Sequence, residues 1–120
     1  MMEVGRKASL SRSFTAGDLA DFAALTGQEV GHDSVPEPLV AALISHLLGV
    51  HLPGPGTNYL KQELVFHAPA PVGAGLTAEV EITRLRPEKQ LVDLQASCRD
   101  ADGRLICAGR SLVLARDVAG

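Results

Sequence analysis

Hydrophobic residues are densest between residues 39 and 50, where Ser45 and His46 carry the only polar side chains. A segment that is apolar on nearly every side is typical of a buried helix and not of a surface helix with one apolar stripe. It is too short to cross a bilayer, which takes about 20 apolar residues. A Pro-Gly run over residues 53–56 ends it. We therefore predict a buried central helix at about residues 37–51, enclosed by the rest of the chain.

Before this helix the pattern predicts a first strand over residues 3–14 and then a short helix. Thr15 and Asp18 form a Thr-x-x-Asp helix start, and Gly27 provides the stop. The apolar face of this short helix is expected to consist of Leu19, Phe22, Ala23 and Leu25. Residues 28–35 are polar and are expected to form the loop into the central helix.

Four strand-like segments follow the Pro-Gly run, over residues 58–68, 76–83, 91–99 and 104–115. In the first of them, one face is expected to carry Leu60, Gln62, Leu64 and Phe66. The second and third alternate most regularly, which predicts buried positions at Leu76, Ala78, Val80, Ile82, Val92, Leu94, Ala96 and Cys98. If Asp102 and Gly103 form a two-residue hairpin turn, Cys98 lies directly opposite Cys107.

This order of elements predicts an α+β fold in which a meander of antiparallel strands curls around one helix. A length of 120 residues suits a single domain over residues 1–120. One open sheet leaves an unpaired edge and cannot enclose the helix completely. Two subunits that pair their sheets would cover both the unpaired edge and the open side of the helix, so a dimer is expected.

The composition of the chain limits the classes of partner that it is expected to bind. The net charge is −3 and the basic residues are scattered, so nucleic acid is not an expected partner. Only 3% of the residues are aromatic and none is Trp, which removes the stacking platforms of single-strand binders. The N-terminus lacks the apolar core of a secretory signal, so a cytoplasmic protein without a membrane partner is expected. The cysteines are interpreted as buried structural thiols, and neither metal-ligand spacing nor a Gly-rich phosphate loop is present.

Several blocks of the chain resemble the MaoC-like hydratases of the hotdog fold. They are EVGRKASLSRSFT, DLADFAALTG, LVAALISHLLG, the long block LPGPGTNYLKQELVFHAPAPVGAGLTAEVEIT, and a final two-strand hairpin. Within that group the chain is most similar to the (R)-specific enoyl-CoA hydratases, which supply monomers for polyhydroxyalkanoate synthesis. The resemblance implies an antiparallel sheet of about five strands around a central helix, dimerising into a continuous sheet. It also implies reversible hydration of trans-2-enoyl-CoA, or of the enoyl-acyl carrier protein, in fatty-acid or polyhydroxyalkanoate metabolism. No cofactor is implied.

The chain departs from this family just before the central helix. In the family the short helix runs into an Asp-x-Asn-Pro-x-His motif, and a His-Gly pair precedes the central helix after a further dozen or more residues. Here Gln28 occupies the Asp position, the Asn-Pro is missing, and about a dozen residues are absent. Pro36 and Glu37 stand where the His-Gly pair would be.

Hydration of an enoyl thioester needs a base for the attacking water, an acid for the α-carbon and a donor for the thioester oxygen. The shortened loop offers Glu29, His32 and Asp33. By the resemblance, His32 is the acid/base and Glu29 or Asp33 its carboxylate partner. The N-terminus of the central helix is the expected oxyanion donor.

Three further residues are expected near the substrate. Ser45 matches the family's helix serine beside the catalytic residues, and the resemblance places residues near Leu48 along the acyl tunnel. Glu37 could contact the substrate, or it could stabilise the positive end of the helix dipole. The alternative for Ser45 is a hydrogen bond back to the carbonyl of Ala41. His46 is expected to pack at a subunit interface.

Two other functions stay open. The first is a thioesterase, with Glu37 or Asp33 activating water against the carbonyl carbon. The second is a degenerate hotdog that binds acyl thioesters without turning them over, or that forms the non-catalytic half of a heterodimer with a complete hydratase subunit. The shortened loop keeps this second alternative open.

Overall fold

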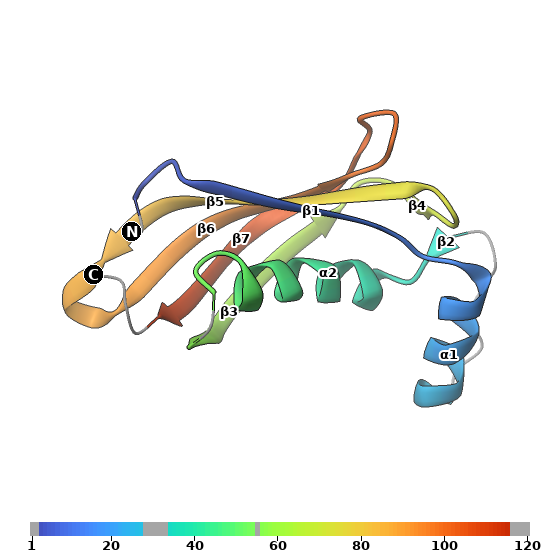
Figure 1. The fold of residues 1–120 in the computed structure, drawn as a ribbon, viewed down its shortest axis with the longest axis horizontal. Coiled ribbons are helices and arrows are strands. Elements are labelled where there is room, and N and C mark those ends of the chain that lie inside the picture. The colour runs from blue at the N-terminus through green and yellow to red at the C-terminus, as the bar shows by residue number, and fades with distance from the viewer. Residues whose placement is uncertain (1–2, 28–33, 55, 116–120) are drawn as a thin grey trace.

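The computed structural model describes residues 3–27, 34–54 and 56–115 of the chain. The helices are α1 (Ala16–Thr26), α2 (Glu37–Val50) and a 3-10 turn η1 (Pro87–Lys89). The strands are β1 (Lys7–Ser13), β2 (Ser34–Val35), β3 (Thr57–Phe66), β4 (Ala70–Pro71), β5 (Gly75–Arg86), β6 (Leu91–Arg99) and β7 (Leu105–Ala115). The large sheet arches over α2, whereas α1 stands away from this sheet, near β2 (Figure 1). Neither α1 nor α2 is long and apolar enough to cross a membrane.

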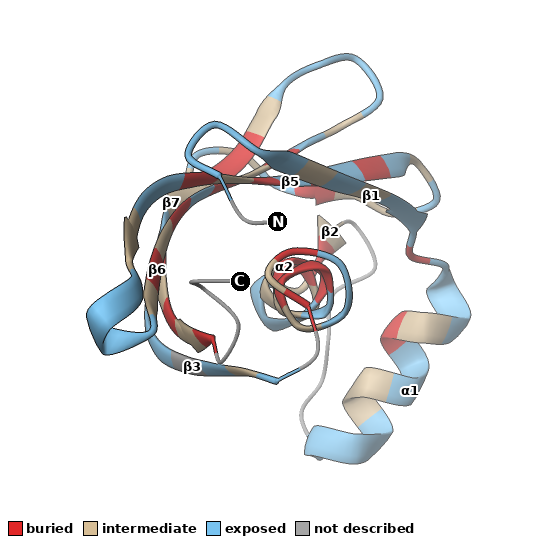
Figure 2. Cartoon of the chain, turned by 60° about the vertical axis from the view of Figure 1, so that its left-hand side comes forward, coloured by how far each residue is buried: buried red, intermediate tan, exposed pale blue. Residues whose placement is uncertain are grey.

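The large sheet has five antiparallel strands in the order β1-β5-β6-β7-β3. The predicted sheet of about five strands around the central helix is therefore confirmed. The predicted meander of four consecutive strands is wrong at one step, because β3 pairs with β7 and not with β5. With β3 and β1 at opposite edges, the sheet can curl past two sides of α2, as Figure 2 shows. The small β2-β4 sheet was not predicted.

The core lies between α2 and the concave face of the sheet. The helix contributes the buried residues Val40, Leu43, Ile44, Leu47 and Leu48. All eight positions predicted from the alternation in β5 and β6 are completely buried. Each large apolar side chain removed from water contributes about 1.5–3 kcal/mol, so this contact dominates the stability of the fold.

One side of α2 remains open in the single chain. Ala42, His46 and Val50 are exposed at a spacing of four residues, and Val50 retains 50% of its accessible surface. This open side agrees with the expectation that one open sheet cannot enclose the helix completely. The physical reason is that the sheet curls past two sides of the helix and leaves this side uncovered (Figure 2).

The short helix α1 has the predicted ends. Thr15 Oγ1 accepts the Asp18 N–H at 3.2 Å, and Asp18 Oδ2 accepts the Thr15 N–H at 2.8 Å. The Thr15 hydroxyl also donates to Asp18 Oδ2 at 3.1 Å, and the two hydrogen bonds that the carboxylate accepts from the Thr15 N–H and hydroxyl hold the pKa of Asp18 below its usual range. Gly27 ends the helix in the left-handed conformation with φ 70°. The predicted apolar face is wrong at Leu25, which is 87% exposed, whereas Leu19 is buried.

The β6–β7 hairpin reaches the predicted register through a different turn. Cys98 lies opposite Cys107, as predicted. The Asp100 N–H donates to the Arg104 carbonyl at 3.0 Å, so the turn contains three residues and not two. A register shift directly after Cys98 compensates for the extra residue. Gly103 adopts φ 83°, which glycine tolerates at little cost.

A similar irregularity changes the predicted face of β3. Its register with β7 shifts between Tyr59 and Lys61, and Leu60 is 55% exposed. Gln62, Leu64 and Phe66 remain half-buried, as the alternation predicted. The expected face therefore begins only after this bulge.

Candidate active site

A hollow of about 350 Å³ opens at the start of α2. The short β2-β4 sheet connects this helix end to the chain that follows β3, since Ser34 pairs with Pro71 and Val35 with Ala70. One wall of the hollow comes from the start of α2 and the other from residues 66–70, with Ile106 between them. Segments far apart in sequence thus meet at one helix end.

The hollow combines polar groups with an apolar lining. Its polar side chains are Glu37 and His67, which are exposed, and Ser34, which is half-buried. Most of the remaining lining is apolar, and Val40 and Ile106 are completely buried there. A lining of this kind suits a ligand with a short apolar chain and a polar head.

The backbone at this helix end leaves one donor open. Pro36 and Pro38 have no N–H, and the N–H groups of Leu39 and Val40 donate to the Pro36 carbonyl at 3.0 and 3.4 Å. Among the described residues, the N–H of Glu37 is therefore the donor of the first turn without an acceptor. The positive end of the helix dipole makes that position favourable for negative charge.

The predicted catalytic residues Glu29, His32 and Asp33 lie outside the described residues, so their roles stay predictions. In the sequence they come just before Ser34, which lines the hollow. Of the predicted substrate-binding residues, Glu37 lies in the hollow. Ser45 and Leu48 are not among its lining residues.

Ser45 and Leu48 lie further along α2. Ser45 is half-buried two turns beyond the start of the helix, and Leu48 is completely buried in the core. The Gly54 N–H donates to the Leu48 carbonyl at 2.9 Å. The structure therefore joins Leu48 to the closed end of the helix, and its predicted contact with an acyl chain stays untested.

His67 lines the hollow, although the sequence did not indicate it as a candidate site residue. The sequence predicts a strand over residues 58–68 that includes His67, but β3 ends at Phe66 and His67 lies in the connection to β4. Its N–H donates to the Ile106 carbonyl at 2.8 Å, which anchors its backbone at the hollow. Side chains that bind ligands often lie in the loop directly after a strand. The position of His67 after the predicted strand was therefore the feature of the sequence that could have indicated it.

A second hollow of about 400 Å³ lies on the open side of α2, against β1. Arg12 and His46 line it from the two sides. Arg12 also stacks on the Phe14 ring at 4.5 Å and lies 3.6 Å from the Asp18 carboxylate. Its charge is thus already partnered. The predicted interface role of His46 stays a prediction.

The two cysteines are unsuited to nucleophilic chemistry. Both are completely buried, and burial raises the pKa of Cys98 to about 12 and that of Cys107 to about 11. At neutral pH both are therefore neutral thiols, and the thiolate is the reactive form. Among the described residues, no group of three His, Cys, Asp or Glu side chains could hold a metal ion.

Comparison with known proteins gives a consistent result. No family model matches the chain. An (R)-specific enoyl-CoA hydratase of Aeromonas caviae is 38% identical over 126 residues, covering 93% of this chain and 94% of the relative. One of Rhodospirillum rubrum is 33% identical over 124 residues, covering 92% and 85%. The solved structure of the (R)-hydratase from A. caviae involved in PHA biosynthesis superposes with a TM-score of 0.90, covering 95% of this chain and 97% of that one.

The first of these alignments is longer than this chain. Its 126 residues exceed the 120 residues of this chain, so it contains gaps on this chain's side. Identity of 38% over nearly the whole length and the common hotdog architecture show that this chain belongs to the (R)-specific enoyl-CoA hydratase family.

Proposed function

We propose that the protein catalyses the reversible hydration of a trans-2-enoyl thioester to the 3-hydroxyacyl thioester. The observation that carries this proposal is the hollow at the start of α2. It joins the open N–H of Glu37 to an imidazole, a carboxylate and an apolar lining. The similarity to (R)-specific enoyl-CoA hydratases over nearly the full length supports the same reaction.

In the proposed mechanism, His32 takes a proton from water while the water oxygen bonds to the β-carbon. The electrons of the double bond move toward the thioester oxygen, which accepts a hydrogen bond from the Glu37 N–H. The protonated His32 then gives this proton to the α-carbon, and the 3-hydroxyacyl thioester leaves. Glu29 or Asp33 orients His32. Dehydration follows the same steps in reverse.

The described walls of the hollow suggest how the substrate is held. The acyl chain lies against the apolar side chains of Val40, Phe66 and Ile106, and His67 contacts the polar part of the thioester from the β3 side. The carrier is coenzyme A or acyl carrier protein. The protein acts as a dimer, and a heterodimer with a complete hydratase subunit is the alternative assembly.

A thioesterase is the second candidate, and the position of Glu37 favours it. Its carboxylate lies in the hollow beside the helix donor, where it could activate water against the carbonyl carbon. That reaction breaks the carbon–sulfur bond and releases a free thiol. Hydration leaves this bond intact.

The deciding experiment incubates the purified protein with a short trans-2-enoyl-CoA and follows two signals. Loss of the conjugated thioester absorbance without free thiol is the expected result and supports the hydratase. Release of free thiol would instead support the thioesterase. Tight binding of the thioester with neither signal would contradict both, and hydration that appears only with a complete partner subunit would assign this chain the non-catalytic role.

A further inference from the structure

The start of α2 offers a developing oxyanion a single backbone donor. Two prolines flank Glu37 and have no N–H. The N–H groups of Leu39 and Val40 donate to the Pro36 carbonyl, which leaves that of Glu37 open among the described residues. Sites that stabilise an oxyanion commonly combine backbone N–H groups with side-chain donors. A second donor is therefore expected on another wall of the same hollow.

Two described side chains that line the hollow can donate a hydrogen bond, Ser34 and His67. Ser34 lies in β2, just before α2, so it belongs to the same wall as the helix. His67 comes from the other wall and is exposed. An imidazole donates an N–H in both its neutral and its protonated form. His67 can therefore approach a thioester oxygen from the side opposite the Glu37 N–H.

The backbone around His67 is anchored at the edge of the hollow. The N–H groups of His67 and Ala68 both donate to the Ile106 carbonyl, at 2.8 and 3.4 Å. Pro69 follows directly, and its ring fixes one backbone angle of the connection. A donor on an anchored backbone needs little reorganisation when charge develops on its acceptor.

The two walls are also tied to each other. Val35 pairs with Ala70 between β2 and β4, and both residues are buried. In the sequence, Val35 lies two residues before Glu37, and Ala70 lies three residues after His67. This pairing limits how far the segment of His67 can move from the helix end. Two donors at a restricted separation suit one oxygen atom held between them.

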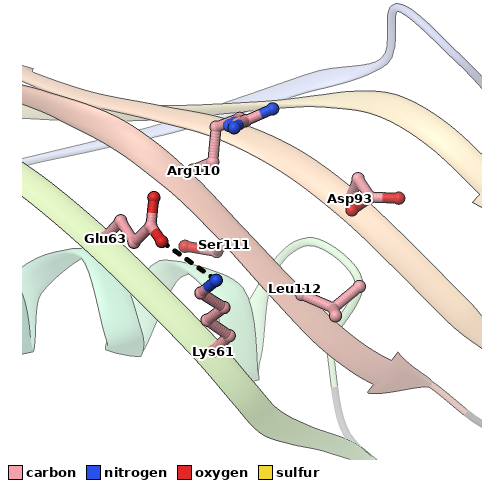
Figure 3. Close-up of a pocket in the computed structure, with 6 residues that line it drawn as sticks. All are labelled: Lys61, Glu63, Asp93, Arg110, Ser111 and Leu112. Carbon is pink, nitrogen blue, oxygen red and sulfur yellow. Dashed lines mark ion pairs between the residues drawn. The ribbon is translucent and has the colours of Figure 1, made fainter.

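A hollow of about 220 Å³ on β3, β6 and β7 lacks this combination (Figure 3). None of its described lining residues is a histidine, and all of them belong to strands. Its charges compensate each other, since Lys61 Nζ lies 3.0 Å from Glu63 Oε1 and an Arg86 nitrogen lies 2.7 Å from Asp93 Oδ2. The pair of an open helix donor and an imidazole thus distinguishes the hollow at the start of α2.

We propose that the His67 imidazole donates a hydrogen bond to the thioester oxygen and is the second oxyanion donor of this site. The inference rests on the proposed function and adds a catalytic residue to it. As the water oxygen bonds to the β-carbon, the electrons of the double bond move to the thioester oxygen, which accepts from both Glu37 and His67. His67 keeps its proton throughout. The carbonyl forms again when His32 protonates the α-carbon.

Three substitutions of His67 test this role in the hydration of a short trans-2-enoyl-CoA. His67→Ala and His67→Phe both remove the N–H, and Phe retains a ring. Water can replace part of the lost hydrogen bond at this exposed position, so each should lower kcat by about 10–100-fold. KM should stay near the wild-type value, because the interaction is strongest in the transition state. His67→Gln, whose amide N–H reaches about as far as imidazole Nε2, should recover most of the lost kcat.

The order of these variants separates a hydrogen-bond donor from other roles. A residue that gives its proton to carbon would also fail as His67→Gln, because an amide does not titrate. His51→Ala, outside the hollow, is the control and should keep the wild-type rate, and circular dichroism should show one fold for all variants. A His67→Gln enzyme as slow as His67→Ala would overturn the proposal. So would a loss of kcat in Ser34→Ala that His67→Ala does not share.

The reaction of the wild-type protein separates this inference from the proposed function. Hydration by the wild type with an unchanged kcat in His67→Ala would contradict the donor role alone. Thiol release that the same variants lower in the same order would contradict the hydratase alone, because attack on the carbonyl carbon also places negative charge on this oxygen. A wild type with neither reaction would contradict both.

Discussion

The two ends of α2 differ in whether their backbone groups have hydrogen-bond partners. At the C-terminal end, the N–H groups of His51 and Leu52 both donate to the Leu47 carbonyl at 3.0 Å, and the Gly54 N–H reaches the Leu48 carbonyl. Leu52 is buried beneath this closure. At the N-terminal end, Pro36 caps the helix without a side-chain hydrogen bond from the described residues, and a hollow lies beside it.

This difference shows where a helix can do chemistry. Every helix end leaves backbone groups without partners, and the fold either satisfies them or leaves them to water and ligands. At the C-terminal end, the N–H groups of His51, Leu52 and Gly54 supply the partners. At the other end two prolines remove two donors, and the first turn of the helix, with its positive dipole end, lines the hollow through Glu37. The first three predictions below test this contrast, and the fourth tests the two buried cysteines.

The largest effect is expected from His32→Ala. Loss of a general acid/base typically costs about 10²–10⁴-fold in rate, so hydration of a short enoyl-CoA should fall by at least about 100-fold. The matched control is His51→Ala, a histidine at the closed end of the same helix, which should retain wild-type turnover. Circular dichroism should show the same fold for both. An active His32→Ala enzyme would remove His32 from the mechanism.

Gly54→Ala should destabilise the C-terminal end of α2 without changing the candidate active site at the N-terminal end. Gly54 has φ 96°, where an L-residue costs about 1–2 kcal/mol, so the free energy of unfolding should fall by that amount. Gly49→Ala is the control within the helix, because a Cβ there meets no atom within 4 Å, and it should stabilise by about 0.5–1 kcal/mol. Urea titration measures both. A loss of kcat in Gly54→Ala below its melting range would mean that the two ends are coupled.

Glu37→Gln separates the two enzymatic candidates at the open end. The unfolding free energy should fall by about 0.3–1 kcal/mol, because a negative charge is lost from the positive end of the helix. Hydration should persist or increase, since the backbone N–H remains and a negative charge near the developing oxyanion is removed. A loss of activity above about 100-fold would assign the carboxylate a chemical role, as in the thioesterase mechanism.

The smallest effect on stability at neutral pH is expected from replacing the two cysteines. Their folded pKa values of about 12 and about 11 lie above the ordinary value of 9.0. The native state therefore holds both protons more tightly than the unfolded state. This contribution to stability is complete below pH 9 and is lost as pH rises toward 11–12. Unfolding of the variant C98A/C107A should show a shallower decline above pH 9 than wild type, and an identical decline would contradict the shifts.

Local patterning was sufficient for much of the fold. The alternation in β5 and β6 identified every buried position there, because a strand presents alternate side chains to opposite faces whatever its partner is. The central helix was predicted at about 37–51 and spans Glu37–Val50, since its ends are marked by prolines and glycine. Sequence patterns did not reveal the pairing of β3 with β7, because that contact depends on how the whole sheet curls.

The candidate site divides in the same way. The sequence by itself determined the hotdog family, the α2 helix with Glu37 in its first turn, and the shortened loop that carries Glu29, His32 and Asp33, since each is a matter of residue type and spacing. Only the tertiary structure decided that His67 and Ile106 join Glu37 around one hollow, and that α2 is closed at one end and open at the other. The physical reason is that backbone donors and cavities depend on contacts between distant segments, which no local pattern records.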